Sequence, residues 1–146
     1  MSNRSSLSGS PLSCSGRIGL LAASLLLVAG FCLARLLEPD PRGYGTHQKL
    51  GLPECTFQLF WNRPCPGCGM TTAFAYLVRG QWGAAARANP AGVLLGVTCA
   101  ALIPWMWLSA WRGKTVGVDQ PLQALLLLVI GIATANLAVW GLRFWQ

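Results

Sequence analysis

Three cysteines lie close together in one polar stretch of the sequence, and their spacing suits two kinds of chemistry. Cys65 and Cys68 are separated by two residues, and Cys55 lies ten residues upstream. A two-residue gap lets two thiols turn back onto one metal ion or onto each other. The only histidine, His47, precedes Cys55 by eight residues. The pattern therefore leaves three alternatives open: a zinc site, a redox dithiol, and a turn with a structural role only.

The zinc hypothesis uses Cys55, Cys65, Cys68 and His47 as four tetrahedral ligands, although their spacing is not that of a standard zinc finger. In the redox hypothesis, Cys65 and Cys68 cycle with a disulfide and Cys55 is a resolving or exchange partner. A helix beginning near Gly69 favours this chemistry, since free N–H groups at a helix N-terminus stabilise a thiolate. The chain offers no complete catalytic set besides these cysteines. We therefore expect a non-enzymatic protein.

The rest of the chain is built to lie in a membrane. It is 53% hydrophobic and 10% charged, against about 25% charged residues in an ordinary soluble domain. Residues 18–37, 91–111 and 122–142 are apolar runs of about the twenty residues that a helix needs to cross the hydrocarbon slab. The sequence thus predicts an all-α membrane protein with three transmembrane helices. We expect a disordered tail over residues 1–16 and a single membrane domain over 17–146.

The first apolar run has a rival interpretation as a signal peptide, because Arg4 and Arg17 precede it. The run is longer than a typical signal core and no small-x-small cleavage site follows, so a retained span is the prediction. The bulky Phe31 also argues against a lipoprotein signal at Cys32. The net charge of +7 suits anionic lipid headgroups and not nucleic acid, since the basic residues are scattered singly.

Residues 47–89, between the first two spans, carry the cysteines and weaker helical patterns. One or two short turns are expected between His47 and Asn62. Met70, Phe74 and Leu77 recur at helical spacing, and a second short helix is expected over 81–88. These are predicted to be short amphipathic helices at the membrane interface. Asn89 and Pro90 read as an N-cap and first-turn proline that begin the second span.

A family resemblance rests on the run Cys65-Pro66-Gly67-Cys68-Gly69-Met70-Thr71-Thr72-Ala73-Phe74, followed by Arg79-Gly80 and Asn89-Pro90. This run resembles domain of unknown function 2752, a family of small bacterial multi-pass membrane proteins with a Cys-Pro-x-Cys-Gly-x-Thr motif. The resemblance covers roughly Cys55 to Leu108. It implies the membrane architecture but no substrate. It singles out Cys55, Cys65, Cys68, Thr71, Arg79, Asn89 and Pro90.

One position departs from the family pattern. Many members carry an arginine directly after the motif threonine, where this chain has Thr72. An anion-binding role for that guanidinium would fall here to Arg79, although an arginine in the last turn of a helix is more often a C-cap charge.

The leading hypothesis is an accessory or interaction subunit of the inner membrane, with a structural or metal-binding cysteine hairpin. Its expected partners are lipid and another membrane protein or a second copy. One alternative is a membrane thiol–disulfide oxidoreductase that acts through Cys65 and Cys68, with or without a quinone as its electron acceptor. The other is a small oligomeric transporter component. The last alternative is suggested by Pro104 and Asn136, which lie within the spans. The positive-inside rule leans slightly towards a cytoplasmic cysteine loop.

Overall fold

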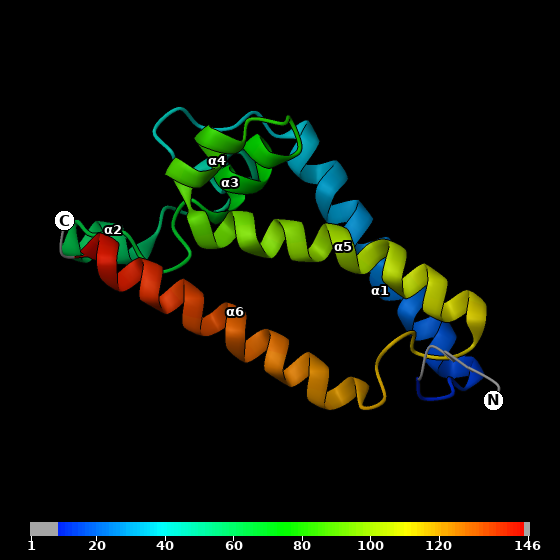
Figure 1. Cartoon of the computed structure of the whole chain (residues 1–146). Helices are drawn as coiled ribbons and strands as arrows, with labels where there is room; N and C mark the ends of the chain where they lie inside the picture. The colour runs from blue at the N-terminus through cyan, green and yellow to red at the C-terminus, as the bar shows by residue number, and fades with distance from the viewer. Residues whose placement is uncertain (1–8, 145–146) are drawn as a thin grey trace.

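The computed structural model describes residues 9–144, which form helices and connecting loops without a β-strand (Figure 1). The order is α1 (Cys14–Leu36), the 3-10 helix η1 (Thr46–Leu50), α2 (Thr56–Trp61), α3 (Met70–Leu77), α4 (Trp82–Ala88), α5 (Pro90–Arg112) and α6 (Pro121–Phe144). Within this part of the chain, three helices (α1, α5 and α6) are long and apolar enough to cross a membrane. The predicted all-α architecture with three spans is confirmed.

The start of α1 differs from the sequence-based expectation. The helix begins at Cys14, with the Ser13 hydroxyl as its N-cap acceptor for the N–H of Gly16. The helix therefore begins within residues 1–16, the stretch predicted to be a disordered tail. Residues 9–13 lie against the loop after α5, where Leu12 N–H donates to the carbonyl of Gly113 at 2.9 Å. Residues 1–8 of the predicted tail lie outside the described residues.

Helices α1 and α5 form the central packed pair (Figure 1). Near one end, Arg17 Nε of α1 donates to the carbonyl of Ala110 of α5 at 2.7 Å. Farther into the pair, the indole N–H of Trp107 of α5 donates to the hydroxyl of Ser24 of α1 at 2.7 Å. Ser24 is fully buried. In hydrocarbon these polar groups have no water to bond with, so pairing across the helices satisfies them.

The segment between α1 and α5, residues 37–89, is called the cap here. Its helices α3 and α4 lie beside the first half of α5 (Figure 1). Glycine makes this approach close: a Cβ on Gly96 of α5 would lie 2.4 Å from Leu77 Cδ2 of α3. Ala73 and Ala75 of α3 are completely buried. The cap is therefore packed against the membrane helices by small residues.

Helix α6 packs against α5 and is also bonded to the cap near its C-terminal end. None of its residues within the described range is buried. The indole N–H of Trp140 donates to the carbonyl of Pro64 at 2.8 Å, and the Trp140 ring meets Phe57 of α2 edge to face with centroids 6.4 Å apart. Asn136 Oδ1 is buried and has no hydrogen-bond partner within residues 9–144. The exposed leucines of α6 suit lipid contact, as expected of a multi-pass membrane protein.

Candidate functional site

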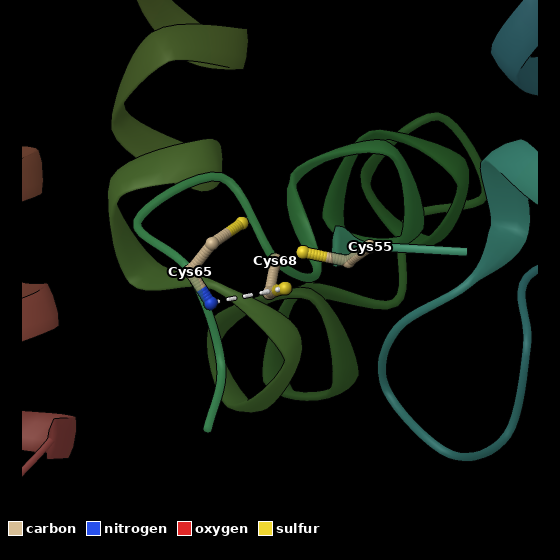
Figure 2. A group of neighbouring side chains, drawn as sticks. All are labelled: Cys55, Cys65 and Cys68. Carbon is tan, nitrogen blue, oxygen red and sulfur yellow. Dashed lines mark hydrogen bonds between the residues drawn. The ribbon is translucent and has the colours of Figure 1, made fainter. Parts of the chain in front are cut away.

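Cys55, Cys65 and Cys68 come together in the cap, and we call them the three-cysteine cluster. Their Sγ atoms all lie within 4.8 Å of one another. The three side chains point into a common space from two separate segments (Figure 2). Cys68 is buried, the other two are half-buried, and all three are free thiols. The sequence-based grouping of these three residues is thus matched by their positions.

A tight turn places Cys65 and Cys68 side by side. The Cys68 N–H donates to the Cys65 carbonyl at 3.0 Å, and the Cys65 N–H donates to Cys68 Sγ at 3.2 Å (Figure 2). Gly69 follows with φ of +84° and is the N-cap residue of α3. That left-handed conformation is favourable only for glycine. The turn therefore ends and α3 begins at a residue that no other type can easily replace.

Gly69 also lies in close contact with two distant segments. A Cβ at this position would lie 2.4 Å from the Ala88 carbonyl oxygen and 2.8 Å from that of Gly43. The turn is thus in close contact with both the end of α4 and the loop after α1. The absence of a side chain at Gly69 is what permits this packing.

Asn89 anchors the turn to the start of α5. Its side chain is 1% exposed. Its Oδ1 accepts from the Gly92 N–H at 3.0 Å, which confirms the predicted N-cap followed by Pro90 in the first turn. Its Nδ2 donates to the Cys68 carbonyl at 3.1 Å. This second role was not foreseen, because nothing local in the sequence shows which carbonyl the amide will meet.

Two thiols of the cluster have their pKa values moved in opposite directions. Burial tends to raise the pKa of Cys55, but N–H groups of Gln58 and Phe57 and the neighbouring thiols outweigh it, so the pKa is lowered. Burial, followed by the hydrogen-bonding Cys65 thiol, raises the pKa of Cys68 to about 12. Near neutral pH, Cys68 is therefore a protonated thiol, while Cys55 is the more acidic of the two.

His47 lies on η1 and is half-buried. The group of ligand atoms that lie together contains the three cysteine sulfurs and not this imidazole. Its role as a fourth ligand stays a prediction. Thr71 is half-buried beside an apolar groove between α1 and α3.

Thr72 occupies the position where many family members carry arginine. It is completely buried, and its hydroxyl is 2.8 Å from that of Thr46, which links α3 to η1. Thr46 was not singled out from the sequence. The site thus holds a hydroxyl pair that binds two elements of the cap together.

Arg79 acts as a C-cap charge, as the sequence predicts for an arginine at a helix end. It caps two helices, its own helix α3 and also α1. Its guanidinium donates to the carbonyls of Ala34 at 3.2 Å and Arg35 at 2.7 Å, and also to Ala75 at 2.7 Å. The last carbonyls of a helix have no intrahelical partner and attract a cation. Arg79 therefore fastens the cap to the end of α1 through both terminal nitrogens of its guanidinium.

Part of this chain matches a known protein family. Residues 55–103 match the family described as a protein of unknown function, DUF2752. The chain resembles this family. No curated protein and no solved structure matches the chain. The matched region begins at Cys55 itself and includes the three-cysteine cluster, Gly69, Arg79 and Asn89. The resemblance to DUF2752 inferred from the motif is confirmed, and it covers the cap from Cys55 onward and the first part of α5.

Proposed function

We propose that Cys55, Cys65 and Cys68 bind one zinc ion through their thiolates. The observation that carries this proposal is the gathering of three sulfurs within 4.8 Å of one another from two segments of the cap. In a tetrahedral site with Zn–S bonds of about 2.3 Å, adjacent sulfurs are about 3.8 Å apart. The thiols therefore need only a small inward movement to bind an ion.

The proposed role of the ion is structural, in an accessory membrane subunit and not in an enzyme. Cys55 is the N-cap residue of α2, and Phe57 of α2 packs on Trp140 of α6. An ion shared by Cys55 and the turn of Cys65 and Cys68 would join α2, and through it the end of α6, to the rest of the cap. The exposed face of α6 is then available to lipid, to another membrane protein or to a second copy.

Zinc content and free-thiol count test this proposal directly. Purified protein is expected to hold about one zinc per chain, with three thiols unreactive until a chelator is added. Serine variants at Cys55, Cys65 or Cys68 are each expected to lose the ion. Cys14→Ser, Cys32→Ser and Cys99→Ser are matched controls and are expected to retain it. Metal-free protein that turns over thiol substrates would contradict both the zinc site and the accessory role.

Metal affinity is expected to rise steeply with pH. The pKa of Cys68 is about 12, so an ion must displace its proton at every pH below that value. Each displaced proton makes the apparent affinity change about tenfold per pH unit. We expect affinity to fall at least a hundredfold from pH 8 to pH 6, measured by competition with a chromophoric chelator. A pH-independent affinity would contradict thiolate ligation by Cys68.

A second candidate, thiol–disulfide exchange, is favoured by the opposite pKa shifts of Cys55 and Cys68. In this reaction the Cys55 thiolate attacks a substrate disulfide and releases one thiol. Cys65 or Cys68 then displaces the second thiol, so that the protein is oxidised and the substrate reduced. Alkylation trapping in intact cells distinguishes the candidates: a fraction of the protein with a disulfide in the cluster supports exchange, and permanently reduced thiols exclude it.

We further propose that the protein lies in the inner membrane with the cap in the cytoplasm. The support is a small excess of basic residues near span ends on the cap side. These are Arg42, Lys49, Arg79, Arg87 and Arg143, against Arg4, Arg17, Arg112 and Lys114 on the other side. A membrane-impermeant thiol reagent that labels Cys65 of metal-stripped protein from outside the cell would overturn this orientation.

A further inference from the structure

A small cavity adjoins the three-cysteine cluster on the side of Cys55. Its volume is about 150 Å³, well below the roughly 300–1,000 Å³ typical of sites for drug-sized ligands. Cys55 belongs both to the cluster and to the wall of this cavity. Its other lining residues are Arg42, Tyr44, Gln48, Glu54, Gln58 and Leu59. A molecule of only a few non-hydrogen atoms that binds in this cavity would therefore lie next to the cluster, at Cys55.

The cavity carries one positive and one negative group with unused hydrogen-bonding capacity. Arg42 binds Asp40 through Nε and Nη2, and its guanidinium lies 5.2 Å from the centre of the Tyr44 ring. Within residues 9–144, Nη1 of Arg42 makes no hydrogen bond, and neither does the carboxylate of Glu54. A ligand with both a carboxylate and an ammonium group can therefore pair with both residues.

Net charge narrows the choice of ligand. Asp40 already offsets the charge of Arg42 by a 2.8 Å ion pair, so a purely anionic ligand gains little and faces Glu54. A purely cationic ligand faces Arg42. A zwitterion satisfies both groups without adding net charge to the cavity.

The cluster itself leaves one position for such a ligand. Three thiolates fill three corners of a tetrahedral zinc site. Because the imidazole of His47 is not among the ligand atoms that lie together, the fourth corner is open to a ligand from elsewhere. Cys68 is buried whereas Cys55 and Cys65 are half-buried, and of the three only Cys55 also lines the cavity.

We propose that the cavity binds a small zwitterionic aminothiol, of the size and charge pattern of cysteine, whose sulfur becomes the fourth metal ligand. This inference rests on the proposed zinc site. Arg42 pairs with the ligand's carboxylate and Glu54 with its ammonium group. As the metal–sulfur bond forms, the thiol proton passes to solvent, and no oxidation state changes. The metal centre is then a ligand-responsive site and not a closed staple.

The test uses the full-length protein in lipid nanodiscs, loaded with Co²⁺ as a coloured substitute for zinc. Three thiols are titrated while the cobalt–thiolate absorption is recorded: L-cysteine, cysteamine, which lacks the carboxylate, and 3-mercaptopropionate, which lacks the ammonium group. We expect L-cysteine to half-saturate at a concentration at least tenfold below that of the other two. Equal half-saturation by all three, or removal of cobalt from the protein by L-cysteine, would overturn the proposal.

Two variants assign the charges. Arg42→Gln is expected to weaken L-cysteine about tenfold and to leave cysteamine unchanged, while Glu54→Gln is expected to weaken L-cysteine and to leave 3-mercaptopropionate unchanged. Lys49→Gln, which alters a basic residue outside the cavity, is the matched control and is expected to change nothing. A variant that weakens all three thiols equally counts against charge recognition. Protein that binds cobalt but no thiol overturns this inference alone, whereas protein that binds no cobalt overturns the zinc site as well.

Discussion

Replacing Gly69 with alanine is expected to destabilise the cap more than any other single methyl addition in the turn. The new Cβ would lie 2.4 Å from the carbonyl oxygen of Ala88 and 2.8 Å from that of Gly43. Neither contact involves a flexible side chain, so backbone must move. The φ of +84° adds a left-handed strain of about 1–2 kcal/mol. We expect a total loss of about 3 kcal/mol or more and a metal affinity reduced at least tenfold.

Alanine variants of two other glycines distinguish the steric contribution to the loss of stability from the contribution of backbone strain. Gly67→Ala lies in the same turn, where the new Cβ meets only the Cys65 sulfur at 3.9 Å, and should be nearly neutral. Gly80→Ala has a φ of +72° but open space around the Cβ, so it should show the backbone strain alone. Thermal unfolding in detergent, followed by circular dichroism, measures the series. If the Gly69 variant unfolds at the temperature of the Gly67 variant, the close packing of the turn is wrong.

Asn89→Ala is expected to have the next largest effect, because it removes two buried interactions at once. The N-cap bond to the Gly92 N–H is worth about 1 kcal/mol. The Cys68 carbonyl loses its donor, which leaves a buried acceptor unsatisfied at a cost of about 1–3 kcal/mol. The turn of Cys65 and Cys68 should loosen as well, so we expect zinc affinity to fall about 10–100-fold.

Asn89→Ser divides these contributions. Serine keeps an acceptor for the cap bond, but its hydroxyl is too short to replace the amide that reaches the Cys68 carbonyl. It should therefore retain most of the helix stability and still lose metal affinity. Thr98→Ala removes a hydroxyl bonded to Leu94 on the exposed face of the same helix and serves as the control. Equal zinc affinity in the wild type and in Asn89→Ala would contradict the anchoring role of the amide.

Much of the membrane architecture was predictable, since a span in hydrocarbon requires a continuous apolar run that can be seen directly in the sequence. The helix boundary at Asn89 and Pro90 was likewise marked by residues whose local chemistry is restrictive. The start of α1 was misplaced, because residues 9–13 are ordered by the loop after α5, and no local pattern shows such a contact.

Some features of the candidate site were also predictable from local sequence, whereas others depend on contacts between distant segments. The proximity of Cys65 and Cys68 follows from their two-residue spacing, but that of Cys55 depends on how the chain returns to the turn. Arg79 bonds to α1 more than forty residues away, and Thr72 pairs with Thr46 of η1. The cavity beside Cys55 exists only because the loop of Arg42 folds over the segment of Glu54.

Hydropathy and spacing alone were therefore enough to establish the three spans, the all-helical class and the cysteine motif, because each depends on neighbouring residues and their solvent. The packing of the cap against the helices decided which residues hold the cluster, which of Cys55 and Cys68 has the lower pKa, and where a ligand can bind. Those outcomes arise from contacts between segments that are far apart in the chain, and such contacts depend on the shape of both surfaces at once.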